Sequence, residues 1–186
     1  MPLVLASASP RRAELLSAAG FTFDVSASAV DETPRAGETP DAYALRVAEE
    51  KAGAAVARHP DAMILAADTV VVAGGQILGK PLDAADARRM LSLLAGTTHD
   101  VVTAVVLAGN WQSRSEVVRT RVAFGQLSQA EIDWYVATGE PDGKAGAYAI
   151  QGRAARFIDR IEGSWSNVVG LPVATVYRML KESGCT

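Results

Sequence analysis

Cysteine is nearly absent from this chain, because Cys185 is the only one among 186 residues. A single cysteine excludes an intramolecular disulfide, a Cys-based zinc site and a redox pair. Long apolar runs are also missing, since stretches such as AMILAADTVVVAGG are interrupted by Asp68 and are too short to span a bilayer. The first residues, MPLVLASAS, have no basic segment, so we expect no signal peptide. These absences predict a cytoplasmic protein without a membrane partner.

An excess of positive charge is missing as well. The chain has 18 Lys and Arg against 21 Asp and Glu, a net charge of −3. Proteins that bind nucleic acid usually carry a basic excess, so we expect no nucleic-acid partner and disfavour a nucleic-acid-binding domain. A basic cluster in such a chain is local and fits a small anion.

The segments that are present alternate between strand-like and helix-like patterns. Strands are expected over residues 3–6, 21–26, 62–68, 69–73, 76–78, 99–108, 116–124 and 154–161. Helices are expected after N-caps at Ser9, at Thr39 or Asp41, at Asp83 and at Ser128, with a last one over 172–182. Gly74-Gly75 is typical of a tight hairpin turn. With no repeat and no clear linker, the sequence predicts one α/β domain over residues 1–186, built on a mixed sheet.

Two adjacent arginines stand at the start of the first expected helix, in SASPRRAELLSAAG. Ser9 suits the N-cap and Pro10 the first helical position, so Arg11 and Arg12 fall in the first turn. Cations are disfavoured there, because the backbone dipole is already positive. The strand, turn and helix N-terminus form an anion site, and two arginines fit an anion with several charges, such as a polyphosphate. The alternative is that both arginines are solvated and pair with Glu14 or a distant carboxylate.

Four more charged residues are candidates for chemistry. Lys51 lies on an apolar helical stripe, where a lysine that extends outward to water is a better expectation than one that points into a cleft. Asp68 ends a buried apolar run, Lys80 is held between two turn residues, and Glu32 lies in a polar loop. As a set, two arginines and two lysines would surround a polyphosphate. Glu32 and Asp68 would hold Mg²⁺ or Mn²⁺, and a carboxylate would deprotonate a water molecule.

Five motifs occur in one order along the chain: SASPRR, ADTVV, GKP, DGKAGAYAIQG and SNVVGLP. Together they resemble the Maf family of septum-formation-inhibitor-like nucleotide pyrophosphatases, from Leu3 to the last helix. The resemblance implies an elongated α/β fold with two lobes and a central cleft, similar to inosine triphosphatases. It also implies a homodimer that uses a divalent metal to hydrolyse a nucleoside triphosphate to the monophosphate and pyrophosphate.

The resemblance also implies roles for individual residues. Asp68 matches the catalytic proton acceptor, Lys51 and Lys80 match further catalytic residues of the cleft, and Glu32 matches another polar residue there. Arg11 and Arg12, with Ser9 at the same helix start, match the part of the cleft that faces the phosphates.

Three positions point to one branch of the family. Arg11, Thr69 and Gln151 resemble the branch that acts on dTTP and UTP, whereas the 7-methyl-GTP branch tends to carry Trp, Gln and Glu there. A Gln amide both donates and accepts hydrogen bonds, which suits the imide edge of a pyrimidine. VDETPR and GKP resemble the second branch equally well, so a 7-methyl-GTP pyrophosphatase stays an alternative. A non-catalytic nucleotide-binding regulator of cell division is the other alternative.

Overall fold

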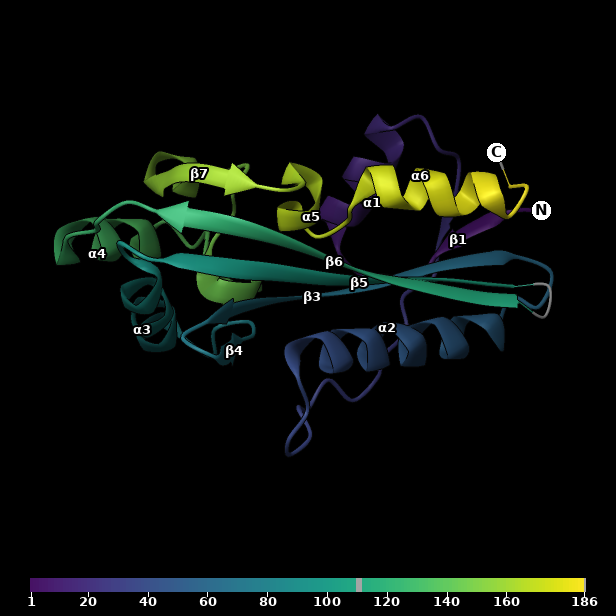
Figure 1. Ribbon diagram of the computed structural model, residues 1–186, viewed down its shortest axis with the longest axis horizontal. Helices are drawn as coiled ribbons and strands as arrows, with labels where there is room; N and C mark the ends of the chain where they lie inside the picture. Colours follow the sequence, from purple (N-terminus) through teal and green to yellow (C-terminus); the bar gives the residue numbers. More distant parts are fainter. Residues whose placement is uncertain (110–111, 186) are drawn as a thin grey trace. The chain divides into compact units, whose positions relative to one another are not determined.

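The computed structural model describes residues 1–109 and 112–185 (Figure 1). Within this range, seven strands form one mixed sheet in the order β2-β1-β3-β5-β6-β7, with β4 paired to β3. The strands are β1 (Leu3–Leu5), β2 (Asp24–Val25), β3 (Met63–Ala73), β4 (Gln76–Leu78), β5 (Thr98–Gly109), β6 (Gln112–Phe124) and β7 (Ile158–Glu162). The helices are α1 (Pro10–Ala18), α2 (Pro40–Val56), α3 (Ala84–Leu94), α4 (Gln129–Ala137), α5 (Trp165–Val169) and α6 (Val173–Glu182), with 3₁₀ turns η1 (Ala145–Ala147) and η2 (Arg153–Phe157). The predicted α/β fold with a mixed sheet is confirmed.

The chain divides into two compact units. The first comprises Met1–Asp68, Thr103–Val118 and Gly170–Thr186, and the second comprises Thr69–Val102 and Arg119–Val169. Three strands, β3, β5 and β6, each contribute residues to both units. The two units agree with the two lobes that the family resemblance implies, while the assignment of one domain to residues 1–186 stays a prediction.

In the first unit, helices lie on both faces of the strands. Met63, Leu65 and Ala67 alternate along β3 and pack with residues of α1 and α6 in one apolar core. Helix α2 lies on the opposite side of the strands from α1 and α6 (Figure 1). The Thr39 hydroxyl caps α2 by accepting a hydrogen bond from the Ala42 N–H at 3.2 Å. Since side chains alternate along β3, the even-numbered residues, Asp68 among them, project away from the α1 and α6 core.

In the second unit, α3 and α4 begin at the predicted caps. The Asp83 carboxylate accepts the Asp86 N–H at 2.8 Å, and Ser128 forms a reciprocal capping box with Glu131. Arg88 of α3 pairs with Asp133 of α4 at 2.6 Å. The Gly74-Gly75 hairpin between β3 and β4 is confirmed.

Several expected boundaries are wrong. The strand predicted over 154–161 begins only at Ile158, because Arg153–Phe157 forms a 3₁₀ turn that buries Ala154 and Phe157 three residues apart. Helix α5 was not predicted, and β2 is two residues long instead of six. The strands expected over 62–68 and 69–73 are one strand, β3, which runs from Met63 to Ala73 without a break. The GNWQ turn falls partly outside the described residues.

Candidate functional site

Asp68 lies in the middle of β3, not at its end as the sequence suggested. The neighbouring strand β1 pairs with β3 only from Met63 to Leu65, and the N–H of Ala6, directly after β1, donates to the Leu65 carbonyl at 2.8 Å. Beyond that point the chain turns into α1, so the edge of β3 next to Asp68 is no longer covered by β1. The strand that ends near Asp68 is therefore β1, the neighbour of β3, and α1 begins shortly after the end of β1.

Lys51 of α2 joins Asp68 to Glu32. The lysine is only 8% exposed, and its Nζ lies 2.8 Å from Asp68 Oδ1 and 2.7 Å from Glu32 Oε1. The expectation that Lys51 extends outward to water is therefore wrong. Its ammonium stays in the interior because two carboxylates, from a strand and a loop, replace the water it gives up.

The electrostatics of this cluster favour a proton acceptor at Asp68. Burial raises the pKa of Asp68, and the neighbouring Lys51 and Arg12, which act in the opposite direction, do not cancel that effect. A carboxylate with a raised pKa is a stronger base than an exposed aspartate, and it remains ionised when the pH lies above that pKa. The geometry thus allows Asp68 to take a proton from a bound water.

Arg12 points inward from the first turn of α1. It is 8% exposed, and its guanidinium donates to the Gly170 carbonyl at 2.8 Å and to the Ser7 hydroxyl at 3.1 Å. Burial lowers the pKa of Arg12, while the charges of Asp68 and Glu32 raise it and that of Arg11 lowers it. The alternative in which both arginines are solvated is wrong for Arg12.

Ser9 and Arg11 complete this helix start. Ser9 has the extended backbone of an N-cap, but its hydroxyl makes no capping bond. Its N–H donates to the Ser7 hydroxyl at 3.2 Å, so Ser7 binds both this N–H and Arg12. Arg11 is half-buried, and the first turn contains no acidic residue. The predicted N-cap is right for the backbone of Ser9 and wrong for its side chain.

The loop that carries Glu32, residues 26–39 (the Glu32 loop), is held by α2. Arg46 donates to the carbonyls on both sides of Glu32, that of Asp31 at 3.5 Å and that of Thr33 at 3.1 Å. The Tyr43 hydroxyl donates to the carbonyl of Glu32 itself at 2.8 Å.

Arg46 is itself fixed by a bidentate pair with Glu38, at 2.7 and 2.9 Å. Sequence reasoning assigned no role in the site to Arg46 or Tyr43. The sequence does contain a signal for them: Tyr43 and Arg46 are three residues apart, so they lie on one side of a helix that directly follows the acidic loop.

The remaining predicted residues belong to the second unit. Thr69 follows Asp68 in β3 and is half-buried, whereas Lys80 and Gln151 are exposed. The Gly79 carbonyl, next to Lys80, accepts the Gly146 N–H at 3.0 Å. This bond ties the Lys80 segment to the DGKAGAYAIQG loop that carries Gln151. The structure thus brings Ser9, Arg12, Glu32, Lys51 and Asp68 together in the first unit and presents Thr69, Lys80 and Gln151 in the second.

The profile of the Maf-like protein family matches residues 2–183. The chain belongs to the Maf-like family. It is 54% identical to the dTTP/UTP pyrophosphatase of Myxococcus xanthus, over 98% of this chain and 92% of that protein. It is 50% identical to the protein of the same name from Koribacter versatilis, over 99% of this chain and 95% of that one.

A solved structure, that of the Staphylococcus aureus Ham1 protein, is similar with a TM-score of 0.57 and 14% sequence identity. The match covers 98% of this chain and all of that one. At this identity the likeness concerns the fold alone, and it agrees with the fold expected from the sequence.

A metal site in this Maf-like protein would depend on two carboxylates. Among residues 1–109 and 112–185, no group of three or more His, Cys, Asp or Glu side chains is arranged to hold a metal ion. Glu32 and Asp68 converge on one cation, the Lys51 ammonium, so the pair matches a hard cation in charge and donor type. Oxygens from phosphate and water would have to complete the ligand set.

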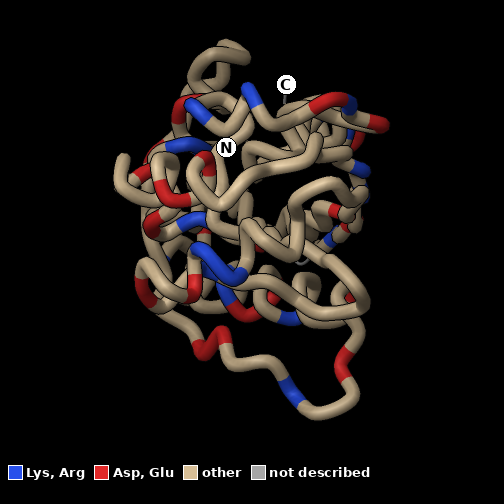
Figure 2. The backbone as a smooth tube through the Cα atoms, turned by 90° about the vertical axis from the view of Figure 1, so that its left-hand side faces the viewer, with Lys and Arg blue, Asp and Glu red and all other residues tan. Residues whose placement is uncertain are grey.

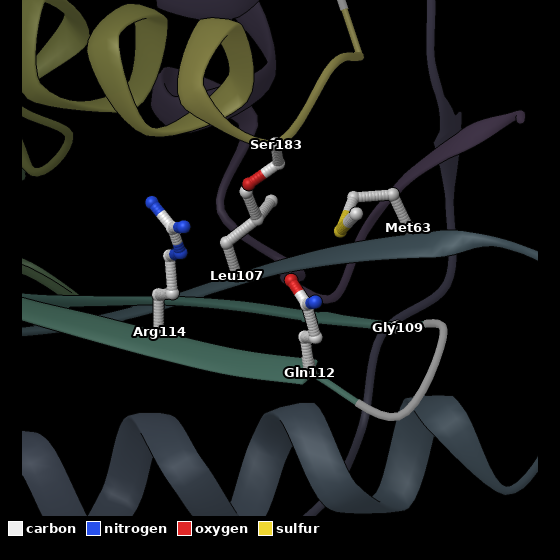
Figure 3. Close-up of a pocket in the computed structure, with 6 residues that line it drawn as sticks. All are labelled: Met63, Leu107, Gly109, Gln112, Arg114 and Ser183. Carbon is white, nitrogen blue, oxygen red and sulfur yellow. The ribbon is translucent and has the colours of Figure 1, made fainter.

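A small pocket occurs elsewhere in the first unit (Figure 3). Gln112 and Arg114 point from β6 toward α6, and Ser183 faces them from the end of that helix. None of the predicted site residues lines this pocket, so it is separate from the Asp68 cluster.

Acidic and basic positions are interspersed along the described chain (Figure 2). Within the described ranges, no helix combines the length and the apolar character needed to span a bilayer.

Proposed function

We propose that the chain is a nucleoside triphosphate pyrophosphatase that hydrolyses dTTP and UTP, including modified pyrimidine nucleotides, to the monophosphate and pyrophosphate. The observation that carries this proposal is the buried Asp68 carboxylate. It is held by Lys51, and its charge raises the pKa of Arg12, against the lowering effect of burial. The names of relatives about half identical over nearly the whole chain support the substrate class.

The chemistry assigns a role to each side chain of the cluster. Asp68 accepts a proton from a water whose oxygen forms a bond to the α-phosphorus, and the bond from the α-phosphorus to the bridging oxygen of the β-phosphate breaks. Arg11, Arg12, Lys51 and Lys80 bind phosphate oxygens and offset the charge that moves onto the leaving pyrophosphate. Ser9 adds the N-terminal end of α1 to this phosphate-binding set.

We propose Mg²⁺ or Mn²⁺ as the cofactor, bound by Glu32 and Asp68 together with the substrate. A divalent ion held there would offset phosphate charge and would lower the pKa of a bound water. Lys51, which contacts both carboxylates, orients them before the substrate arrives.

Base preference is assigned to Arg11, Thr69 and Gln151. The Gln151 amide is exposed in the second unit and has both a donor and an acceptor for a pyrimidine edge. We further propose a cytoplasmic homodimer that acts on free nucleotides, and sedimentation of the purified protein tests the dimer.

A panel of nucleoside triphosphates, 7-methyl-GTP included, assayed for pyrophosphate with and without Mg²⁺ or Mn²⁺, tests the function. We expect release from UTP and dTTP that depends on the metal. Binding without turnover would support the regulator of cell division instead, and a preference for 7-methyl-GTP would support the other branch.

Asp68→Asn tests the mechanism. We expect kcat to fall about 10²–10⁴-fold, because the variant removes the proton acceptor but retains the size of the side chain. Asp61→Asn, at an exposed position just before β3, is the matched control and should keep full activity. Near-normal turnover of Asp68→Asn would remove Asp68 from this role.

A further inference from the structure

Gln151 lies in residues 149–154 (the Gln151 loop), a turn that leads into the first two residues of η2 and is bonded to one carboxylate. Glu140, three residues after α4, accepts the Arg153 N–H at 3.0 Å through Oε2 and the Ala154 N–H at 3.3 Å through Oε1. Both donors follow Gln151 in the chain. Glu140 thus fixes the backbone on the C-terminal side of Gln151.

The same carboxylate is linked to the other side of Gln151 through Tyr135. This tyrosine of α4 is fully buried, and its hydroxyl donates to Glu140 Oε1 at 2.8 Å while it accepts the Ala149 N–H at 3.1 Å. Two side chains therefore hold the backbone both before and after Gln151, although Gln151 itself is exposed. We call this pair the Tyr135–Glu140 clamp.

Packing around the clamp leaves Glu140 little freedom. A Cβ placed on Gly152 would lie 2.5 Å from Glu140 Oε1, so the carboxylate lies directly against the backbone next to Gln151. Tyr148, just before the loop, is buried and bonds His99 through its hydroxyl at 2.9 Å.

The charge of Glu140 is also stabilised by these contacts. Partial burial alone raises the pKa of Glu140, but the hydrogen bonds from Arg153, Tyr135 and Ala154 outweigh it and hold the pKa below its usual range. The carboxylate is therefore ionised at neutral pH, and an ionised carboxylate makes the stronger hydrogen bonds.

We propose that Tyr135 and Glu140 are positioning residues for base recognition, acting through Gln151. The inference rests on the proposed function, because it assigns to the clamp the orientation of the amide that selects pyrimidines. An amide must present its donor and its acceptor to the two matching groups of the base at once, so a small tilt of the loop reduces discrimination. In the proposed function the reacting phosphates are bound by other residues, Arg11, Arg12, Lys51 and Lys80.

Glu140→Gln and Tyr135→Phe test the inference. Glu140→Gln keeps the shape but places an NH₂ group against backbone N–H donors, and Tyr135→Phe removes the hydroxyl that joins Ala149 to Glu140. We expect each to lower the ratio of kcat/KM for UTP to that for GTP about tenfold, mainly by raising KM for UTP. Glu131→Gln is the matched control, because it replaces the carboxylate that bonds Ser128 at the start of α4.

A double-mutant cycle with Gln151→Ala separates positioning from a general loss of structure. If the clamp acts through Gln151, Glu140→Gln should change the UTP to GTP ratio less than about twofold once Gln151 is absent. Equal effects in both backgrounds, or equal losses for UTP and GTP, would overturn the inference. Should Glu140→Gln fail to fold, Tyr135→Phe supports the same cycle.

The outcomes for the two proposals are distinct. A wild-type protein that releases no pyrophosphate from any nucleotide contradicts the proposed function, and the ratio is then measured as the affinities of non-hydrolysable UTP and GTP analogues. A wild-type protein that prefers UTP, with clamp variants that keep that preference, contradicts only the clamp.

Discussion

The Glu32 loop and the Gln151 loop each carry one predicted site residue. In each loop, backbone groups near that residue are hydrogen-bonded to side chains that lie on a helix or just after it. In the Glu32 loop the held groups are carbonyls, which accept hydrogen bonds from Arg46 and Tyr43. In the Gln151 loop the held groups are N–H donors, which bind Glu140 and Tyr135. A cation orders one loop and an anion orders the other, each with the help of a tyrosine hydroxyl.

This difference predicts the pH at which each loop loses its hydrogen bonds. The guanidinium of Arg46 is planar and binds Glu38 in a bidentate pair, an arrangement that survives wide changes of pH. The Gln151 loop instead follows Tyr148, whose partner His99 is buried and uncharged. Acid should therefore weaken the second loop before the first.

The largest expected effect is on stability in acid. Burial lowers the pKa of His99 to about 4, with Asp100 acting weakly against it. The unfolded chain, where histidine titrates near 6.5, takes up the proton first, so the unfolding free energy falls between about pH 6.5 and 4, by roughly 3 kcal/mol. Urea unfolding at pH 7 and pH 4.5 measures this loss, and His99→Gln, which cannot titrate, should lose correspondingly less.

The Glu32 loop should respond at lower pH. The hydrogen bond from Arg46 is the main cause that lowers the pKa of Glu38 to about 2. Its stabilising effect is complete above about pH 4.5 and disappears only as the pH falls through about 2. Equal pH dependence in the wild type and in His99→Gln would show that the histidine does not distinguish the two loops.

The next largest effect is expected from Arg46→Ala. The variant releases the carbonyls on both sides of Glu32 and should lower kcat/KM about tenfold to a hundredfold for every nucleotide, with the UTP to GTP ratio unchanged. Arg46→Lys, which keeps the charge but loses the fork, should recover only part of the activity. Arg35→Ala is the control, since that arginine lies exposed on the same loop and pairs with Glu50. A changed base preference in Arg46→Ala would contradict the separation between the loops.

The smallest effect is expected from Tyr43→Phe. It removes one hydrogen bond to the Glu32 carbonyl, which typically contributes about 1 kcal/mol, so kcat/KM should fall about fivefold. Burial, with the nearby Asp68 and Glu32, raises the pKa of Tyr43 to about 12, so the hydroxyl remains a donor in alkaline assays. Tyr177→Phe, at a half-exposed position, should leave the rate unchanged.

Local sequence predicted the elements whose signals are local. The caps at Asp83 and Ser128, the cap at Thr39 rather than the alternative Asp41, and the Gly74-Gly75 turn need only neighbouring residues, and all are present. The sequence predicts a strand over 154–161 where Arg153–Phe157 forms a 3₁₀ turn, because the burial of Ala154 and Phe157 depends on tertiary packing that local sequence does not encode. Helix α5 has five residues, too few for a periodic signal.

The site was predictable as a set of residues and less so in its geometry. Lys51 was expected to extend to water because its helix alone offers no partner, and the two carboxylates that hold it come from residues 19 positions earlier and 17 positions later. Tyr43, Arg46, Tyr135 and Glu140 were not predicted, because they act on backbone groups distant in the sequence. Because any amino acid supplies a backbone carbonyl, and any except proline an N–H, the identity of the residue that is bound gives no signal in the sequence.

The Tyr135–Glu140 clamp accepts hydrogen bonds from the peptide N–H groups of residues 149, 153 and 154, which almost any amino acid supplies. The hydrogen bonds of the clamp therefore do not depend on which side chain stands at position 151. A substitution at position 151 therefore alters one of the three residues assigned to base preference and leaves the hydrogen bonds of the clamp in place, whereas Gly152 should be kept, because a Cβ there would lie 2.5 Å from Glu140 Oε1.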